Sequence, residues 1–103
     1  MFKIDMRFSD NVYELCRRIP RGKVSTYGMI AGKMKTKACR AVGNALNKNP
    51  YKSVPCHRVI NSNGFVGQFS KGTEAKIRML KSEGIIIDKN GFIDLTKYLY
   101  KFK

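Results

Sequence analysis

The segment from Pro55 to Val59 holds the residues of this sequence best suited to covalent chemistry. Cys56 lies beside His57, the only histidine of the chain, and Pro55 stiffens the backbone before them. A cysteine attacks as its thiolate, and only a few per cent of a free thiol is ionised at neutral pH. His57 and Arg58 supply a neighbouring base and a neighbouring cation. The pattern predicts a nucleophile on a rigid basic loop; a structural cysteine in such a loop is the alternative.

The adjacent positions of Cys56 and His57 favour an indirect contact between their side chains. Neighbouring residues of an extended segment point to opposite sides, so we expect His57 to reach Cys56 through a water molecule. Glu83 follows Leu80 by three residues, near the inward face of a predicted helix, where an unpaired carboxylate is costly. We expect His57 to be its partner; a solvated glutamate at a helix end is the alternative.

The charge of the chain favours a polyanionic partner. The chain has 21 Lys and Arg against 7 Asp and Glu among 103 residues, a formal net charge of +14. Such an excess on a small domain attracts polyanions over a long range, so nucleic acid is the first candidate. An anionic membrane surface and plain solubility are the alternatives.

Cysteine usage and hydropathy exclude several other classes. The three cysteines are odd in number and widely spaced, and one histidine is too few for an ordinary zinc site. We therefore expect no disulfide framework, no metal and no cofactor. No apolar run is long enough to span a membrane, and the N-terminus lacks the order of a secretory signal. We expect one soluble, cytoplasmic domain over residues 1–103.

Helical periodicity accounts for most of the elements that must position the basic loop. Apolar residues follow a period of 3.6 over about 9–19, 27–34, 37–48 and 73–83. The expected N-terminal caps are Ser9 for the first helix, Ser25 or Thr26 for the second, and Thr73 for the fourth, and Gly84 is the expected left-handed stop.

Two turn signals complete the predicted fold. Residues 61–64 and 90–91 lie between apolar residues and predict two small β-hairpins. The second and third helices are joined by a tight turn, and the third has an outer stripe of Lys37, Arg40, Asn44 and Asn47. We predict a mostly α, winged-helix-like helix-turn-helix domain with a core over about 8–95 and a tail, 96–103, that can fray.

Four motifs resemble a known family when they are taken together. They are Val24-Ser25-Thr26-Tyr27-Gly28, Arg40-Ala41-Val42-Gly43, Asn49-Pro50 and Pro55-Cys56-His57-Arg58-Val59. In this order and at this spacing they resemble the C-terminal domain of the O6-alkylguanine-DNA alkyltransferases, over about residues 8–87. The resemblance implies DNA repair by a monomer, in which an alkyl group, such as methyl, passes irreversibly from a flipped-out guanine to Cys56.

The resemblance also implies a role for each matching residue. His57 is the water-mediated base, Glu83 orients it, and Asn49 braces the loop against the third helix. Arg40 enters the base stack from the minor groove and Tyr27 contacts the flipped base. Further DNA contacts are implied for Lys37, Ala41 and Asn44, and the implied substrate pocket is lined by Tyr27, Leu46, Val59, Val66, Gly67, Phe69, Ser70 and Lys76.

Several positions depart from the family pattern or allow a plainer interpretation. We expect the family's N-terminal domain, which holds part of the zinc site of some members, to be absent. Phe69 replaces a common tyrosine, and Cys39 stands where a small residue is usual, which favours packing. Arg40 as a phosphate contact, Tyr27 as a core-edge aromatic and Asn49 as a helix stop remain open.

Two other functions fit part of the pattern. Alkyltransferase-like lesion sensors bind alkylguanine without repairing it and resemble this chain in having one domain, but they carry Trp at the position of Cys56. This chain has no Trp. A winged-helix transcription factor would need more base-reading side chains than the third helix offers.

Overall fold

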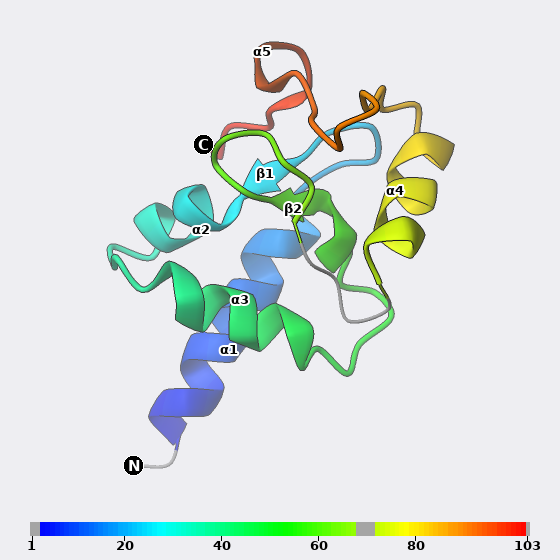
Figure 1. Cartoon of the computed structure of the whole chain (residues 1–103). Helices are drawn as coiled ribbons and strands as arrows, with labels where there is room; N and C mark the ends of the chain where they lie inside the picture. Colours follow the sequence, from blue (N-terminus) through cyan, green and yellow to red (C-terminus); the bar gives the residue numbers. More distant parts are fainter. Residues whose placement is uncertain (1–2, 68–71, 103) are drawn as a thin grey trace.

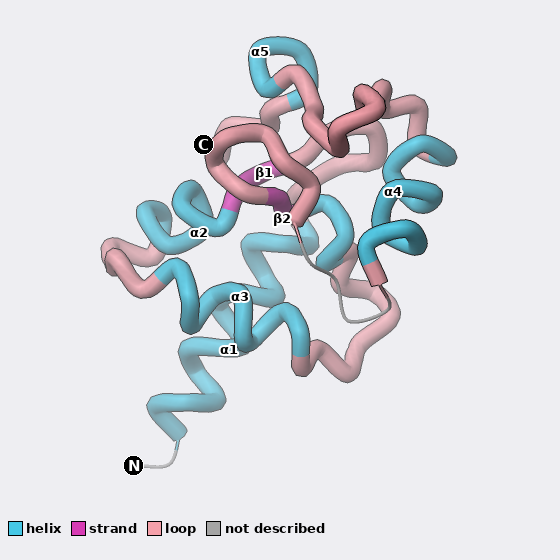
Figure 2. Tube along the Cα trace, viewed as in Figure 1, coloured by secondary structure: helices cyan, strands magenta, loops and turns pink. Residues whose placement is uncertain are grey.

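The fold is mostly helical, with one small sheet (Figures 1 and 2). The structure is a computed structural model that describes residues 3–67 and 72–102, with side chains from Phe8 onward. The elements, in chain order, are α1 (Lys3–Arg17), β1 (Ser25–Thr26), α2 (Tyr27–Lys33), α3 (Cys39–Asn47), the 3₁₀ turn η1 (Cys56–Arg58), β2 (Val59–Ile60), α4 (Thr73–Ser82) and α5 (Leu95–Tyr98). In the described part of the chain, no helix combines the length and apolar character that crossing a membrane requires.

The predicted helix-turn-helix is formed by α2 and α3, which pack on α1 (Figure 1). Thr26 caps α2, because its Oγ1 accepts a hydrogen bond of 3.1 Å from the Met29 amide. Tyr13 on α1 donates its hydroxyl to the carbonyl of Ala45 on α3 at 2.8 Å. The inward residues Val12, Cys16, Ile19, Ile30 and Val42 are fully buried. The mostly α, helix-turn-helix class predicted from periodicity is confirmed.

Two of the expected helix caps are not cap residues in the structure. Ser9 lies inside α1 rather than at its cap, since the helix already begins at Lys3 and no Gly or Pro interrupts residues 3–9. Thr73 is the first residue of α4, and its cap position belongs to Gly72, whose φ of 95° suits glycine. At the other end, Gly84 has the predicted left-handed conformation, with φ at 89°.

The sheet joins segments that the sequence did not pair. β1 lies parallel to β2, with Ser25 opposite Val59 and Thr26 opposite Ile60. The start of α2 is thereby fixed beside η1, which directly precedes β2 (Figure 1). This parallel pair is the arrangement that brings the helix-turn-helix to the segment carrying Cys56.

The two predicted turns form, each with a short antiparallel contact of its own, and they are also joined to one another. The Asn61 amide donates to the Phe65 carbonyl at 3.0 Å, and Phe65 then forms an antiparallel bridge with Phe92. Gly64 permits this approach, because a Cβ there would lie 2.8 Å from the carbonyl oxygen of Ile93. Antiparallel pairing across the second turn is limited to Ile87 and Ile93.

The C-terminal tail is docked rather than frayed over its described residues. Val24 donates its amide to Tyr98 at 2.9 Å and accepts one from Tyr100 at 2.8 Å. Tyr100 and Phe102 then pack against the helical core. The basic composition of the tail suggested mobility, but its aromatic side chains gain apolar contacts and its backbone gains a bridge beside β1.

Candidate functional site

Cys56, His57 and Arg58 form the single 3₁₀ turn η1 rather than an extended segment. The Arg58 amide donates to the Pro55 carbonyl at 2.9 Å, and the Cys56 amide donates to Val54 at 2.9 Å. A 3₁₀ turn has about three residues per turn, so successive side chains leave it in different directions. His57 is buried and Cys56 is partly exposed. The prediction of an extended segment is therefore wrong, although here too the two side chains diverge.

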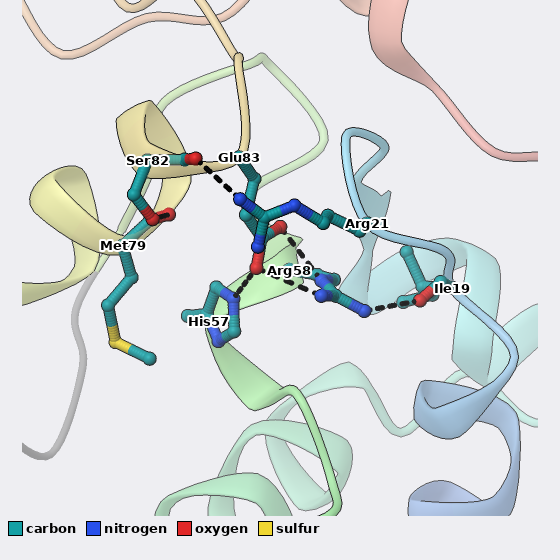
Figure 3. A network of polar contacts seen from close by, with 7 residues as sticks. All are labelled: Ile19, Arg21, His57, Arg58, Met79, Ser82 and Glu83. Carbon is teal, nitrogen blue, oxygen red and sulfur yellow. Dashed lines mark hydrogen bonds and ion pairs between the residues drawn. The ribbon is translucent and has the colours of Figure 1, made fainter.

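Glu83 is paired with His57, as predicted from the sequence (Figure 3). His57 Nε2 lies 2.7 Å from Glu83 Oε2, and the side chains are only 9% and 6% exposed. The sequence did not reveal that Arg58 shares this carboxylate: its Nε donates to Oε1 and its Nη2 donates to Oε2, both at 2.9 Å. The one available signal was the presence of Arg58 in the same motif.

The protonation states of His57 and Glu83 follow from their burial and from their hydrogen-bond partners. Burial lowers the pKa of His57 below its usual 6.5, and the Arg58 charge adds to this, although the hydrogen bond and charge of Glu83 oppose it. Burial would raise the pKa of Glu83, but hydrogen bonds from Arg58 and His57 lower it overall. At neutral pH, His57 is thus a neutral imidazole that donates Nε2–H to a carboxylate and keeps Nδ1 as a proton acceptor.

Acidification should destabilise the protein through this pair. Below about pH 6.5 the unfolded chain protonates its histidine before the folded one does, and below about pH 4.5 the same holds for Glu83. The free energy of unfolding, measured with urea between pH 7 and pH 4, should therefore fall as the pH falls. The double variant His57→Gln, Glu83→Gln should show a shallower decline; an equally steep decline would contradict the role of the pair.

Asn49 braces the loop that leads to Cys56. Its Nδ2 donates to the carbonyls of Tyr51, at 2.9 Å, and Val54, at 3.3 Å, and its Oδ1 accepts from the Tyr51 amide at 2.9 Å. The Asn49 amide also donates to Leu46 at the end of α3, at 3.2 Å. These hydrogen bonds fix the loop to the end of α3. A residue that only ended the helix would not make them.

A hollow of about 670 Å³ opens beside this loop. It is lined by Arg17, Leu46, Asn49, Pro50, Tyr51, Lys52, Ser53, Val54, Pro55, Cys56, His57, Arg58 and Met79. Tyr51 and Arg17 were missed by sequence reasoning; the Arg17 guanidinium lies 5.7 Å from the centre of the Tyr51 ring. Cys56 is the cysteine that lines this hollow.

A second hollow, of about 550 Å³, lies over the outer face of α3. It is lined by Tyr27, Cys39, Arg40, Gly43, Asn44, Asn47, Asn61, Phe65 and Gly67. The structure thus brings the predicted DNA-contacting residues Arg40, Asn44 and Tyr27 together. Ala41 is half-buried on the same helix. Lys37 is exposed but precedes α3, because the helix begins two residues later than predicted.

The predicted pocket residues are divided between the two hollows and the buried core. Leu46 lines the first hollow, Tyr27 and Gly67 line the second, and Val59 and Val66 are fully buried. Phe69 and Ser70 lie outside the described residues.

Lys76 is fully buried beside the site, although the sequence placed it only at the pocket. Its Nζ donates to the Val59 carbonyl at 2.8 Å and lies 5.8 Å from the centre of the Tyr27 ring. Burial lowers the pKa of this ammonium to about 8. Lys76 thus places a cation at the backbone of Val59, the residue that directly follows η1.

The three cysteines have different environments. Cys16 is fully buried on α1, as predicted, and burial raises the pKa of its thiol to about 12, which leaves it inert. Cys39 was expected to serve packing, but it is exposed at the start of α3 and lines the second hollow. Cys56 is the partly exposed cysteine next to a histidine.

The chain is similar to known proteins over most of its length. The family model described as "6-O-methylguanine DNA methyltransferase, DNA binding domain" matches residues 7–85. The chain is 48% identical over 82 residues to a methylated-DNA–protein-cysteine methyltransferase of Sulfolobus acidocaldarius, covering 79% of this chain and 52% of that protein. It is 43% identical over 91 residues to a bifunctional methyltransferase/endonuclease of Picrophilus torridus, covering 86% and 30%.

A solved structure is similar over almost its whole length. S. pombe Atl1, in complex with damaged DNA containing O6-carboxymethylguanine, matches with a TM-score of 0.85 and 35% identity, covering 94% of this chain and 97% of that one. In contrast, the chain spans about a third to a half of the two curated relatives above. On the family match and these identities, the chain belongs to the family of 6-O-methylguanine DNA methyltransferase DNA-binding domains.

Proposed function

We propose that this chain repairs DNA directly, by moving an alkyl group from O6 of a damaged guanine to Cys56. The observation that carries the proposal is the arrangement of η1. A partly exposed cysteine lines a hollow beside a buried, neutral histidine, whose ring is fixed by an ionised glutamate. A core thiol would have no use for such a neighbour, whereas a nucleophile needs a base close by.

The proposed reaction begins with extrusion of the damaged base. A guanine O6 inside a duplex is out of reach of a thiol on a turn, so the nucleotide must rotate out at a cost of a few kcal/mol. His57 Nδ1 takes the Cys56 proton through a water molecule. The thiolate then attacks the alkyl carbon, the bond from that carbon to O6 breaks, and the guanine keeps the electron pair and takes up a proton. The thioether has no easy leaving group, so each chain reacts once.

DNA binding in this proposal is mainly electrostatic. The net charge is +14, and α3 presents Arg40 and Asn44 on its outer face, with Tyr27 alongside. Affinity for plain duplex should fall log-linearly with salt, by roughly a factor of a thousand between 50 and 200 mM if about six phosphates are neutralised. Fluorescence anisotropy would measure this slope, and a flat salt dependence would exclude nucleic acid as the partner.

Arg40 is proposed to enter the base stack from the minor groove and fill the gap left by the flipped nucleotide. It is exposed at the start of α3 and, together with Tyr27, lines the second hollow. Arg40→Ala should slow transfer from duplex roughly tenfold or more, yet leave transfer from single strands nearly unchanged, because single strands have little stack to replace. Rapid-quench rates on both substrates test this. Equal slowing on the two would reduce Arg40 to a phosphate contact.

A non-catalytic lesion sensor is the second candidate function. The similarity to Atl1, whose structure was solved in complex with damaged DNA containing O6-carboxymethylguanine, favours it, with a TM-score of 0.85. Cys56 and its His57–Glu83 partner favour transfer instead, because a protein that only binds needs neither a thiol nor a base. We further propose that the protein acts as a monomer inside the cell, where thiols stay reduced.

One experiment separates the two candidates. The protein is incubated with excess duplex containing O6-methylguanine, and its intact mass is compared with that after unmodified duplex. A gain of one methyl group supports repair. Tight binding to the lesion without any gain in mass would favour the sensor, and absence of both would reject the proposed function.

A further inference from the structure

The guanidinium of Arg58 is engaged at all three of its nitrogens. Nε and Nη2 donate to the two oxygens of Glu83 at 2.9 Å each, and Nη1 donates to the Ile19 carbonyl at 2.8 Å (Figure 3). The side chain is 16% exposed and the Glu83 side chain 6%. Arg58 is therefore turned toward Glu83 and Ile19, and its role differs from the simple cation beside Cys56 that its position in the sequence indicated.

These contacts join three parts of the chain that are distant in sequence. Arg58 ends η1, Glu83 caps the C-terminus of α4, and Ile19 lies two residues beyond α1. Ile19 is itself fixed, since it is fully buried and its amide donates to Cys16 at 3.1 Å. The guanidinium of Arg58 is thus held by the fixed carbonyl of Ile19 and at the same time binds the Glu83 carboxylate through two hydrogen bonds.

The orientation of His57 depends on this two-point contact between Arg58 and Glu83. A glutamate side chain has three rotatable bonds, and a single hydrogen bond to an imidazole leaves its carboxylate free to rotate. A planar two-point contact fixes the carboxylate plane. Oε2 accepts from both Arg58 Nη2 and His57 Nε2, at 2.9 and 2.7 Å. The oxygen that selects the Nε2–H form of the ring is therefore placed by Arg58.

We propose that Arg58 is a positioning residue of the proposed alkyl transfer: through Glu83 it holds His57 with Nδ1 free to accept the Cys56 proton. This inference rests on the proposed function for its rate effects, but not for its effect on the ring. The charged groups acting on His57 are Glu83, Arg58 and Lys76, and only the first of these favours its protonated form. Loss of the Arg58 charge therefore lets Glu83 promote protonation of the base.

Arg21 offers a matched control. Its Nη2 donates to the Ser82 carbonyl at 2.7 Å, so it binds the same end of α4 from the adjoining loop (Figure 3). Arg21 contacts a backbone carbonyl, whereas the Glu83 carboxylate is bound by Arg58. Arg21→Gln thus removes a cation and a contact at the C-terminal end of α4, as Arg58→Gln does, without releasing the carboxylate.

The test compares Arg58→Gln and Arg58→Lys with Arg21→Gln and Arg21→Lys. First-order transfer rates are measured at saturating O6-methylguanine duplex across pH, so that differences in DNA affinity drop out. Arg58→Gln should slow transfer by roughly tenfold to a hundredfold, the factor for one buried charged hydrogen bond, and should move the acid limb of the profile to higher pH. Arg58→Lys should slow transfer while the acid limb stays in place, because an ammonium keeps the charge but cannot form the fork. Both Arg21 variants should retain the rate and the profile.

A second measurement follows the ring directly. The ¹⁵N shifts of the His57 imidazole should report the Nε2–H form in the wild type and in both Arg21 variants, and a mixture of forms in Arg58→Lys. If all four variants have one profile and one ring form, or if both Arg58 variants unfold, Arg58 serves the fold alone and the inference is overturned. A wild type that transfers no methyl group would reject the proposed function, and the ring shifts would still decide the positioning role.

Discussion

Cys56→Ser should lose methyl transfer completely and still bind alkylated duplex. The hydroxyl is far less acidic than the thiol, so the His57–Glu83 pair cannot make it a competent nucleophile, whereas Arg40 and Asn44, which we propose to contact DNA, lie on α3 and are unchanged. Transfer is measured by intact mass after incubation with O6-methylguanine duplex, and binding by anisotropy with the same duplex. The wild type should gain one methyl group per chain and then stop.

The other two cysteines provide internal controls for this result. Cys16→Ser should transfer normally if it folds, because the native thiol is buried and its pKa is raised to about 12. Cys39→Ser should also transfer normally, since that exposed residue lines the other hollow. Peptide mapping should place the methyl group on Cys56. Turnover beyond one equivalent, or full transfer by Cys56→Ser, would refute the proposed mechanism.

His57 and Glu83 should behave as one unit in the transfer rate. Each single change to Gln should slow transfer by roughly 10²- to 10⁴-fold, the usual contribution of a positioned general base. The physical reason is the 2.7 Å contact between His57 Nε2 and Glu83 Oε2: without the carboxylate the ring is neither held nor kept in the Nε2–H form. Rapid-quench transfer at saturating duplex gives these rates.

The double variant decides whether the two residues are coupled. His57→Gln, Glu83→Gln should be little slower than the worse single variant, because Glu83 acts on the rate only through His57, so the second change removes a contribution that is already lost. If the slowing of the double variant equalled the product of the two single factors, His57 and Glu83 would contribute to the rate independently. Glu74→Gln is a suitable control, since Glu74 lies in the first turn of the same helix and is exposed.

The sequence by itself predicted α1 to α4 and the composition of the segment around Cys56, but it did not predict the short helix α5. The 3.6-residue period predicted α2 and α3 closely, and Thr26 caps α2 as expected. These features depend on contacts within a few residues, so they can be inferred from local order. The motif around Cys56 likewise predicted a nucleophile and its base, and the cost of burying a lone carboxylate indicated that Glu83 needs a partner.

Only the tertiary structure decided the features that join distant segments. The parallel pairing of β1 with β2, the bridge between Phe65 and Phe92, and the docking of Tyr100 on Val24 involve no local pattern. Each has one or two residues on either side, which is too few for a period of two to be detected. The tail was misjudged for the same reason, because its binding site is formed by residues some 75 positions earlier.

The site shows the same division. The sequence placed Cys56 and His57 side by side in an extended segment, but η1 is a 3₁₀ turn, because β2 and the braced loop after Asn49 fix both of its ends. Arg58 was expected to act on the thiol, yet a guanidinium binds where two carboxylate oxygens and a carbonyl converge. Residue types are written in the sequence, whereas the direction of a long side chain is set by whichever partners the packed helices bring within its reach.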